Sequence, residues 1–179
     1  MECCCICLES LELPVITPCG HRFCYLCLKG VKIQVQEAEE EEDEKQKQNG
    51  DDVVSCPLCR HPLSKFNIES ATLAMNPTEF DRVLGLRAFA WGYSGLGGWW
   101  LYNDRTGDLI ENQYQKWIET KNTNDAELTI FISGEPYRID FNANTQTNTL
   151  NKRRGIARFT LPLPPGIHIK GVSGLKVPF

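Results

Sequence analysis

The residues with the clearest chemical potential are eight cysteine and histidine side chains that form four close pairs. Three pairs have the spacing C-x-x-C and one has the spacing C-x-H. A C-x-x-C turn directs two thiolates at one ion, and two such turns complete the tetrahedral shell of zinc. Because closed shells leave no position for an activated water, we expect two structural zinc ions. Their ligands would be Cys4, Cys7, Cys19, His21, Cys24, Cys27, Cys56 and Cys59.

The distribution of cysteine and charge indicates two unlike halves. All 9 cysteines lie between Cys3 and Cys59. The net charge of -4 is the sum of about -7 in residues 1–80 and about +3 in residues 81–179. No secretory signal precedes the cysteines and no apolar run approaches the ~20 residues of a membrane span. We therefore expect a soluble, intracellular chain, in which paired cysteines are metal ligands rather than disulfides.

The order of the ligands, with histidine in fourth place, resembles the RING finger family, whereas a PHD finger would have histidine in fifth place. The resemblance implies a cross-brace fold in which alternate pairs share an ion. One zinc would be held by Cys4, Cys7, Cys24 and Cys27. The other would be held by Cys19, His21, Cys56 and Cys59. Two further cysteines, Cys3 and Cys5, are surplus, and we expect spare thiols there; His61 and His168 lack ligand spacing.

RING fingers are typically ubiquitin ligases that dock a charged ubiquitin-conjugating enzyme and hold its ubiquitin in a reactive pose. Such positioning catalysis needs no nucleophile from the ligase. By resemblance, Ile6 and Pro57 would form the apolar groove for the conjugating enzyme. Arg60, directly after the last ligand, would bridge enzyme and ubiquitin, since a guanidinium can donate to two partners at once. The usual bulky aromatic of the groove rim is absent, and Val31, Ile33 or Val35 would replace it.

A long polar segment separates the last two ligand pairs. Residues 34–52 include the acidic run 37–44, which predicts a solvated insert, either disordered or a frayed helix. An acidic segment that competes for a basic ligand site is the alternative. Beyond the finger, Asn76-Pro77-Thr78-Glu79 is a helix start signal. We expect a RING domain over 1–66, a linker over 67–87 with a short helix near 77–87, and a second domain over 88–178.

The second domain has the pattern of a small, curved sheet with one helix. Residues 89–93 and 98–102 flank a glycine-rich turn, as in a hairpin. Ile110, Tyr114, Trp117 and Ile118 fall on one face of an amphipathic helix. Residues 128–132 and 137–141 flank a second turn, and 155–161 predicts another strand. The fold class is therefore α+β.

Trp91, the pair Trp99-Trp100 and Glu111 follow the pattern that gives the WWE domain its name. The segments 98–106, 151–158 and 170–175 strengthen this similarity. One RING followed by one WWE resembles the Iduna-type ubiquitin ligases, which bind poly-ADP-ribose at its iso-ADP-ribose unit. The resemblance implies as partners a charged conjugating enzyme, poly-ADP-ribosylated proteins, and tankyrase-type polymerases with their targets. It further implies proteasomal degradation of those targets, a place in Wnt signalling, and a cytosolic location with a nuclear one as alternative.

The residues suit such a ligand chemically, because adenine needs flat or apolar walls and phosphates need cations. Residues 141–179 carry six basic side chains and no acid. By resemblance, Tyr93, Trp100 and Tyr137 would wall the adenine and ribose, Gln146 would bond the base or a hydroxyl, and Arg154 and Lys170 would hold phosphates. We expect Trp91 and Trp99 to be core residues instead. The family carries an arginine at the position of Leu96, and its absence would remove one phosphate contact.

The resemblance further implies that the ligand activates the ligase, with Lys29 as the RING residue that senses the polymer. Two other interpretations remain open. The chain could be a zinc-stabilised poly-ADP-ribose reader without ligase activity, which Ile6, Pro57 and Arg60 argue against. It could also use its basic, aromatic face on nucleic acid, but the overall acidity and the lack of a basic recognition helix make DNA or RNA binding a poor fit.

Overall fold

The structure is a computed structural model that describes residues 2–40, 54–63, 66–68 and 87–176. The chain divides into two compact units, Met1–Met75 and Asn76–Phe179. The helix expected near 77–87 and most of the acidic insert lie outside the described residues. Within the described part of the chain, no helix is long and apolar enough to span a membrane.

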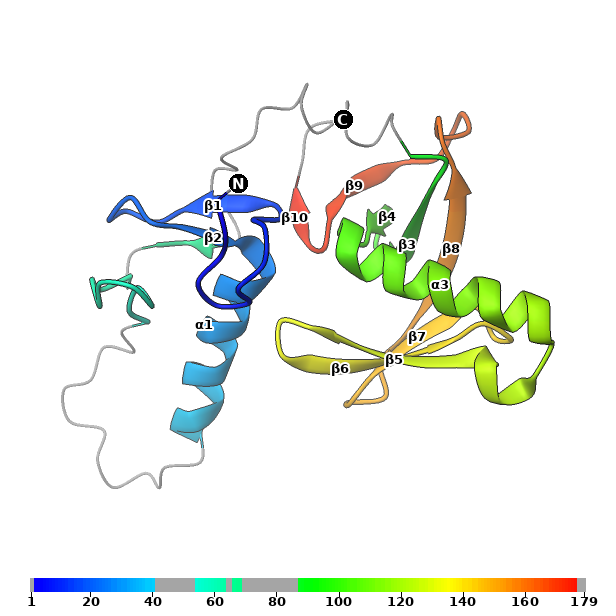
Figure 1. Cartoon of the computed structure of the whole chain (residues 1–179), viewed down its shortest axis with the longest axis horizontal. Coiled ribbons are helices and arrows are strands. Elements are labelled where there is room, and N and C mark those ends of the chain that lie inside the picture. The colour runs from blue at the N-terminus through cyan, green and yellow to red at the C-terminus, as the bar shows by residue number, and fades with distance from the viewer. Residues whose placement is uncertain (1, 41–53, 64–65, 69–86, 177–179) are drawn as a thin grey trace. The chain divides into compact units, whose positions relative to one another are not determined.

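The first unit is built on a two-stranded hairpin and one helix (Figure 1). Strand β1 (Pro14–Ile16) pairs antiparallel with β2 (Arg22–Cys24), and helix α1 (Tyr25–Glu40) follows β2 directly. The side chains of Val15, Phe23 and Leu28 are fully buried. Tyr25 is fully buried as well, and these side chains join the hairpin to the helix.

Helix α1 is a feature that the sequence analysis missed. Residues 34–40, expected to belong to the polar insert, form its C-terminal end. These residues therefore match the helical form of that expectation rather than the disordered one. The start of the helix was not recognised because it lies between the zinc ligands Cys24 and Cys27. Cysteine has no strong helical preference that would mark a helix boundary.

The second unit is one mixed, eight-stranded sheet with a helix across it (Figure 1). The strand order is β10-β9-β4-β3-β8-β7-β6-β5, and only the β4–β9 pair is parallel. The strand bounds are β3 (Phe89–Gly95), β4 (Gly98–Leu101), β5 (Glu127–Ile132), β6 (Glu135–Asp140), β7 (Thr145–Asn148), β8 (Arg153–Thr160), β9 (Ile169–Val172) and β10 (Leu175–Lys176).

The expected hairpins and the expected helix are present. Strands β3 and β4 form the first hairpin, β5 and β6 the second, and β8 covers most of 155–161. Helix α3 (Asp104–Thr120) contains the periodic Ile110, Tyr114 and Trp117, and a short 3-10 turn (Thr123–Ala126) follows it. Ile118, expected on the same face, is 44% exposed, because it lies at the edge of that face. Strands β7, β9 and β10 were not predicted, because they are short and lack an apolar alternation.

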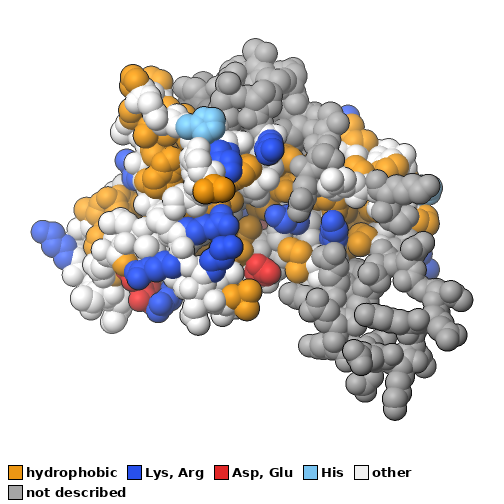
Figure 2. Space-filling model, turned by 180° about the vertical axis from the view of Figure 1, so that it is seen from behind, with side chains coloured by type: hydrophobic (Ala, Val, Ile, Leu, Met, Phe, Trp, Pro, Cys, Tyr) orange, Lys and Arg blue, Asp and Glu red, His pale blue; other side chains and the backbone are white. Residues whose placement is uncertain are grey.

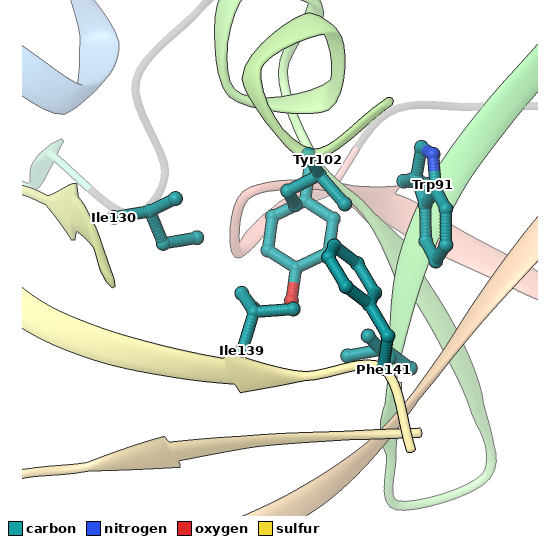
Figure 3. Close-up of a cluster of buried hydrophobic side chains, with 7 residues drawn as sticks. Trp91, Tyr102, Ile130, Ile139 and Phe141 are labelled. Carbon is teal, nitrogen blue, oxygen red and sulfur yellow. The ribbon is translucent and has the colours of Figure 1, made fainter. Parts of the chain in front are cut away.

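The core of the second unit lies between α3 and the sheet (Figure 3). Trp91, Ile130, Ile139 and Phe141 are at most 3% exposed, and Ile110 of the helix is fully buried among them. The rings of Trp117 and Phe141 stack at 5.7 Å, and Tyr114 meets Trp91 edge-on at 5.1 Å. Trp91 is therefore a core residue, as expected, whereas Trp99 is half-buried and packs edge-on against Phe159 at 5.2 Å.

An ion pair between the buried Glu111 and Arg158 ties α3 to the sheet. Glu111 accepts hydrogen bonds from the Trp91 indole at 2.7 Å and from Arg158 at 2.8 Å through two nitrogens. Burial alone would raise the pKa of the Glu111 carboxyl, but the donors Arg158, Gln115 and Trp91 hold that pKa below its usual value. Arg158 is thus engaged within the fold, although the sequence analysis counted it with the basic side chains that suit a polymer.

Candidate metal centres and ligand-binding face

The eight cysteine and histidine side chains lie in two clusters of four. Within each cluster all the ligand atoms are within 4.8 Å of one another. The first contains Cys4, Cys7, Cys24 and Cys27, and the second contains Cys19, His21, Cys56 and Cys59. The structure therefore brings alternate pairs together, which is the cross-brace arrangement.

The local fold explains how each pair is presented. Cys24 ends β2 and Cys27 lies in the first turn of α1, so the strand-to-helix junction directs both thiols to one point. Cys19 and His21 flank Gly20, which sits in the turn before β2 with φ of +83°. The Arg60 N–H donates to the Cys56 carbonyl at 2.9 Å and closes the knuckle of Cys56 and Cys59.

The spacing of the donor atoms fits zinc. Sulfurs about 2.3 Å from a common zinc ion in a tetrahedral shell lie about 3.8 Å apart. The Cys7 and Cys24 sulfurs are 4.0 Å apart, and Nδ1 of His21 lies 3.4 Å and 3.5 Å from the Cys19 and Cys56 sulfurs. Three or four thiols around one point are a typical structural zinc set.

Thiolate, the form that binds metal, is favoured at two of these cysteines. The hydrogen bond with Cys27 and the Glu12 amide lower the pKa of Cys24 to about 5, although burial opposes this. The Thr17 hydroxyl and His21 lower the pKa of Cys19 to about 6, again against burial. The surplus residues Cys3 and Cys5 are exposed and lie outside both clusters.

Around the two clusters, apolar side chains remain accessible. Ile6 is half-buried, and Pro57 and Arg60 are exposed. Leu8 and Leu58, which the sequence analysis did not single out, are 80% and 54% exposed. Leu8 directly follows the ligand Cys7, and Leu58 lies between the ligands Cys56 and Cys59. An apolar residue next to a ligand is the sequence signal that could have identified both. Val31 and Ile33 are half-buried on α1, and the side chain of Val35 lies outside the described residues.

In the second unit, the residues expected to wall a ligand lie on one face of the sheet. Tyr93 and Trp100 are directly paired across β3 and β4. Gln146 pairs with Arg154 across β7 and β8, and Tyr137 is two residues before Ile139, the partner of Gln146 in β6. Because side chains alternate along a strand, these registers put all of them on the same face.

Two cation–aromatic contacts order the basic side chains of this face. The Arg154 guanidinium lies 5.6 Å from the centre of the Tyr93 ring, and the Lys170 ammonium lies 4.9 Å from the centre of the Trp100 ring. Lys170 also donates to the Leu96 carbonyl at 2.9 Å, while the Leu96 side chain is 96% exposed. Figure 2 shows Lys and Arg side chains set among hydrophobic ones, with few acids, on the side of the molecule seen there.

One side chain belongs to this group although sequence reasoning did not assign it to the site. Tyr102 is 5% exposed, its ring centre is 5.1 Å from that of Tyr93, and its hydroxyl donates to Gln146 at 2.6 Å. Gln146 itself is only 4% exposed. The signal that could have found Tyr102 is the alternation Trp100-Leu101-Tyr102, which puts the two aromatics on one face. We call Tyr93, Tyr102, Tyr137, Gln146 and Arg154 the tyrosine–arginine cluster.

The groups of the cluster affect one another's ionisation. Burial, Tyr93 and Tyr137 raise the pKa of the Tyr102 hydroxyl well above its usual value, and Arg154 opposes them. Burial and a hydrogen bond to Glu135 raise the pKa of Tyr137, and Arg154 again acts against them. Arg154 therefore acts on both phenols, whereas Glu135 brings a carboxylate beside Tyr137. The end near Tyr137 consequently suits a neutral ligand group better than a phosphate.

Comparisons with known proteins match each unit to a family. Residues 4–57 match the RING-type zinc-finger and residues 89–158 match the WWE domain. The chain is 32% identical over 177 residues to the E3 ubiquitin-protein ligases RNF146 of Mus musculus and Homo sapiens. It is 33% identical over 179 residues to E3 ubiquitin-protein ligase rnf146 of Salmo salar.

These alignments cover the two sequences unequally. They include 97% of this chain, but 41% of the mammalian relatives and 42% of the Salmo salar relative. The chain therefore spans less than half the length of the curated relatives it matches.

Proposed function

The chain belongs to the family that joins a RING finger to a WWE domain, and we propose that it is a ubiquitin ligase that binds poly-ADP-ribose. The RING unit would dock a charged conjugating enzyme, and the WWE unit would hold the iso-ADP-ribose unit of the polymer. Proteins that carry the polymer, including tankyrase-type polymerases and their targets, would then receive ubiquitin and be degraded by the proteasome. The cytosolic location and the place in Wnt signalling belong to the same proposal.

The two clusters of the RING unit would each hold one zinc ion, which makes two per chain. Their role would be structural, because four protein ligands leave no open coordination position. Zinc binding would supply the folding free energy that the core of Val15, Phe23 and Leu28 lacks. The metal would thereby hold the exposed apolar residues beside the knuckles in one arrangement.

Those apolar residues support the docking step. Ile6, Pro57 and the exposed Leu8 and Leu58 offer an apolar surface next to both clusters, where a conjugating enzyme would bind. Arg60 stands exposed directly after the last ligand, with a backbone anchored to Cys56. Its guanidinium would donate to conjugating enzyme and ubiquitin together.

The tyrosine–arginine cluster supports binding of the polymer. Tyr93, Trp100 and Tyr137 would wall the adenine and ribose, and Gln146 would bond the base. Arg154 would hold one phosphate and Lys170 another, since both are the half-buried cations of this face. A poly-ADP-ribose reader without ligase activity is the second candidate, and the sequence similarity to proteins named ubiquitin ligases favours the first.

The single observation that carries the proposal is the joint presence of both zinc clusters with Arg60 and of the tyrosine–arginine cluster in one chain. The test is autoubiquitination by the purified chain with a panel of conjugating enzymes, with and without poly-ADP-ribose. Transfer that rises with the polymer is the expected result. Absence of transfer with every conjugating enzyme, together with intact polymer binding, would favour the reader instead.

A further inference from the structure

Tyr102 is a buried tyrosine whose hydroxyl the proposed function does not use. It donates to Oε1 of Gln146 at 2.6 Å, a short hydrogen bond between two side chains that are 5% and 4% exposed. The raised pKa of this phenol keeps it protonated and therefore a donor throughout the physiological range. Figure 3 shows the Tyr102 ring among the core side chains, with its hydroxyl on the side of Ile139.

The backbone around Tyr102 is held on both sides. Its N–H donates to the Trp91 carbonyl at 2.9 Å, and the N–H of Asn103 donates to the Ser173 hydroxyl at 3.1 Å. The Ser173 N–H in turn donates to the Leu101 carbonyl at 2.7 Å. These bonds fix the backbone on both sides of Tyr102 and so restrict where its hydroxyl can lie.

An amide group has one acceptor oxygen and one donor nitrogen, and Tyr102 occupies the oxygen. Among the described residues, the hydrogen bond of the Gln146 side chain is the one with Tyr102. With Oε1 held by Tyr102, Nε2 is the donor that Gln146 can offer to a ligand. Gln146 is also the register partner of Arg154, so that nitrogen lies in the tyrosine–arginine cluster.

We propose that Tyr102 is a positioning residue that fixes the amide of Gln146 with its nitrogen toward the ligand, so that the site selects an acceptor atom on the base. This inference rests on the proposed function. In adenine the acceptors are the ring nitrogens, whereas the exocyclic amino group is a donor. Gln146 held in this orientation donates from Nε2 to a ring nitrogen of adenine. A base with a hydrogen-bond donor at the position of that ring nitrogen is disfavoured.

The test is calorimetric titration of the full chain with iso-ADP-ribose and with its 1-deaza, 3-deaza and 7-deaza adenine analogues. The unmodified chain binds iso-ADP-ribose and loses affinity for one of the three analogues. Tyr102→Phe binds iso-ADP-ribose about 2- to 13-fold more weakly, the net value of a neutral hydrogen bond. It also discriminates less against that analogue, because the freed amide can rotate and present its oxygen.

Tyr114→Phe is the matched control, because Tyr114 packs against Trp91 in the same core and does not bond to Gln146. It leaves affinity and analogue discrimination unchanged. Gln146→Glu is the second variant, needed in case Tyr102→Phe lowers stability. This variant keeps an acceptor for Tyr102 but loses the Nε2 donor. Iso-ADP-ribose and the analogue that the unmodified chain binds weakly should then bind with equally low affinity.

Three results overturn the proposal. They are unchanged discrimination in folded Tyr102→Phe, equal affinity of the unmodified chain for all three analogues, and full affinity in Gln146→Glu. These differ from a failure of the proposed function itself, which is an unmodified chain that does not bind iso-ADP-ribose at all; that result removes this inference as well.

Discussion

The two units of this chain bring their candidate site residues together in different ways. In the RING unit the chemistry-bearing residues come in pairs two or three residues apart, and the fold between them is slight: a hairpin of three-residue strands and one helix. In the WWE unit the proposed site residues come from six strands, or lie next to them, and share one face only because the sheet aligns them. The first unit should therefore depend on its metal, and the second on its hydrophobic core and on the ion pair of Glu111 with Arg158.

Removal of zinc should have the largest effect and should separate the two units. Structural zinc contributes about 10–16 kcal/mol of apparent binding free energy to small domains. Chelation, or Cys24→Ser, should unfold the RING unit while the WWE unit stays folded. Metal analysis should return two zinc ions per chain before chelation. All four tryptophans lie between residues 91 and 117, so their fluorescence reports the WWE unit alone. A fluorescence change on chelation would show that the units do not fold independently.

Arg60→Ala should abolish ubiquitin transfer while it leaves zinc content and polymer binding intact. The reason is that Arg60 would act on bound partners and not on the fold, since its side chain is exposed. Arg22→Ala is a matched control, because Arg22 is also exposed on the RING unit but pairs with Glu2 at 3.0 Å. Discharge of a ubiquitin-charged conjugating enzyme is the measurement. If Arg60→Ala transfers ubiquitin at the original rate, its bridging role is wrong.

Arg154→Ala should weaken iso-ADP-ribose binding by about 1.5–3 kcal/mol, the usual value of a hydrogen bond to a charged group. That corresponds to a roughly 10- to 150-fold higher Kd. Tyr137→Ala should cost less, because part of the wall can collapse into the space. Lys152→Ala is the control, since Lys152 is an exposed neighbour in the loop before β8. Equal losses in Arg154→Ala and Lys152→Ala would indicate a diffuse basic surface instead of a defined site.

Glu111→Gln should destabilise the WWE unit by about 1.5–3 kcal/mol at pH 7, because it removes a charge that accepts from Arg158 and Trp91. The pKa of Glu111 is lower in the folded chain than when unfolded. Its stabilising contribution is therefore complete above the unfolded pKa of about 4.3 and is lost as the pH falls through the folded value. Denaturant unfolding followed by tryptophan fluorescence at pH 7 and pH 3 should show the gap between variant and unmodified chain closing in acid.

Lys29→Ala should have the smallest effect and should appear only where both units act together. Its ammonium lies 5.8 Å from the Tyr25 ring, and its side chain is half-buried on α1. The variant should keep basal ubiquitin transfer and polymer affinity but lose the stimulation by poly-ADP-ribose. Lys32→Ala on the same helix is the control. An unmodified chain equally active with and without polymer would mean that the two units are merely tethered.

Deletion of the acidic insert tests whether it affects polymer binding. Deletion of residues 37–48 should raise polymer affinity at low salt if the insert competes for the basic face, and the difference should fade as salt is added. An affinity that does not change with the deletion would leave the insert as a solvated segment.

The sequence by itself predicted the two clusters of cysteine and histidine side chains, the α+β class and the order of the two domains. Pairs such as Cys4 and Cys7 are local, and a metal shell tolerates little variation in ligand type or spacing, so the pattern can be recognised without a fold. The helix of Ile110, Tyr114 and Trp117 was equally readable, because its apolar face has the helical period. The burial of Trp91 was also expected, and it is 3% exposed.

Only the tertiary structure decided which basic and polar side chains meet. It joined Arg158 to Glu111, 47 residues away, and so removed that arginine from the cations that could hold a phosphate. It also placed the buried Tyr102 in hydrogen-bond contact with Gln146, 44 residues away. Such contacts depend on sheet register, and a shift of one residue would send every side chain of a strand to the opposite face. Register is set by the packing of the whole unit, which no local pattern contains.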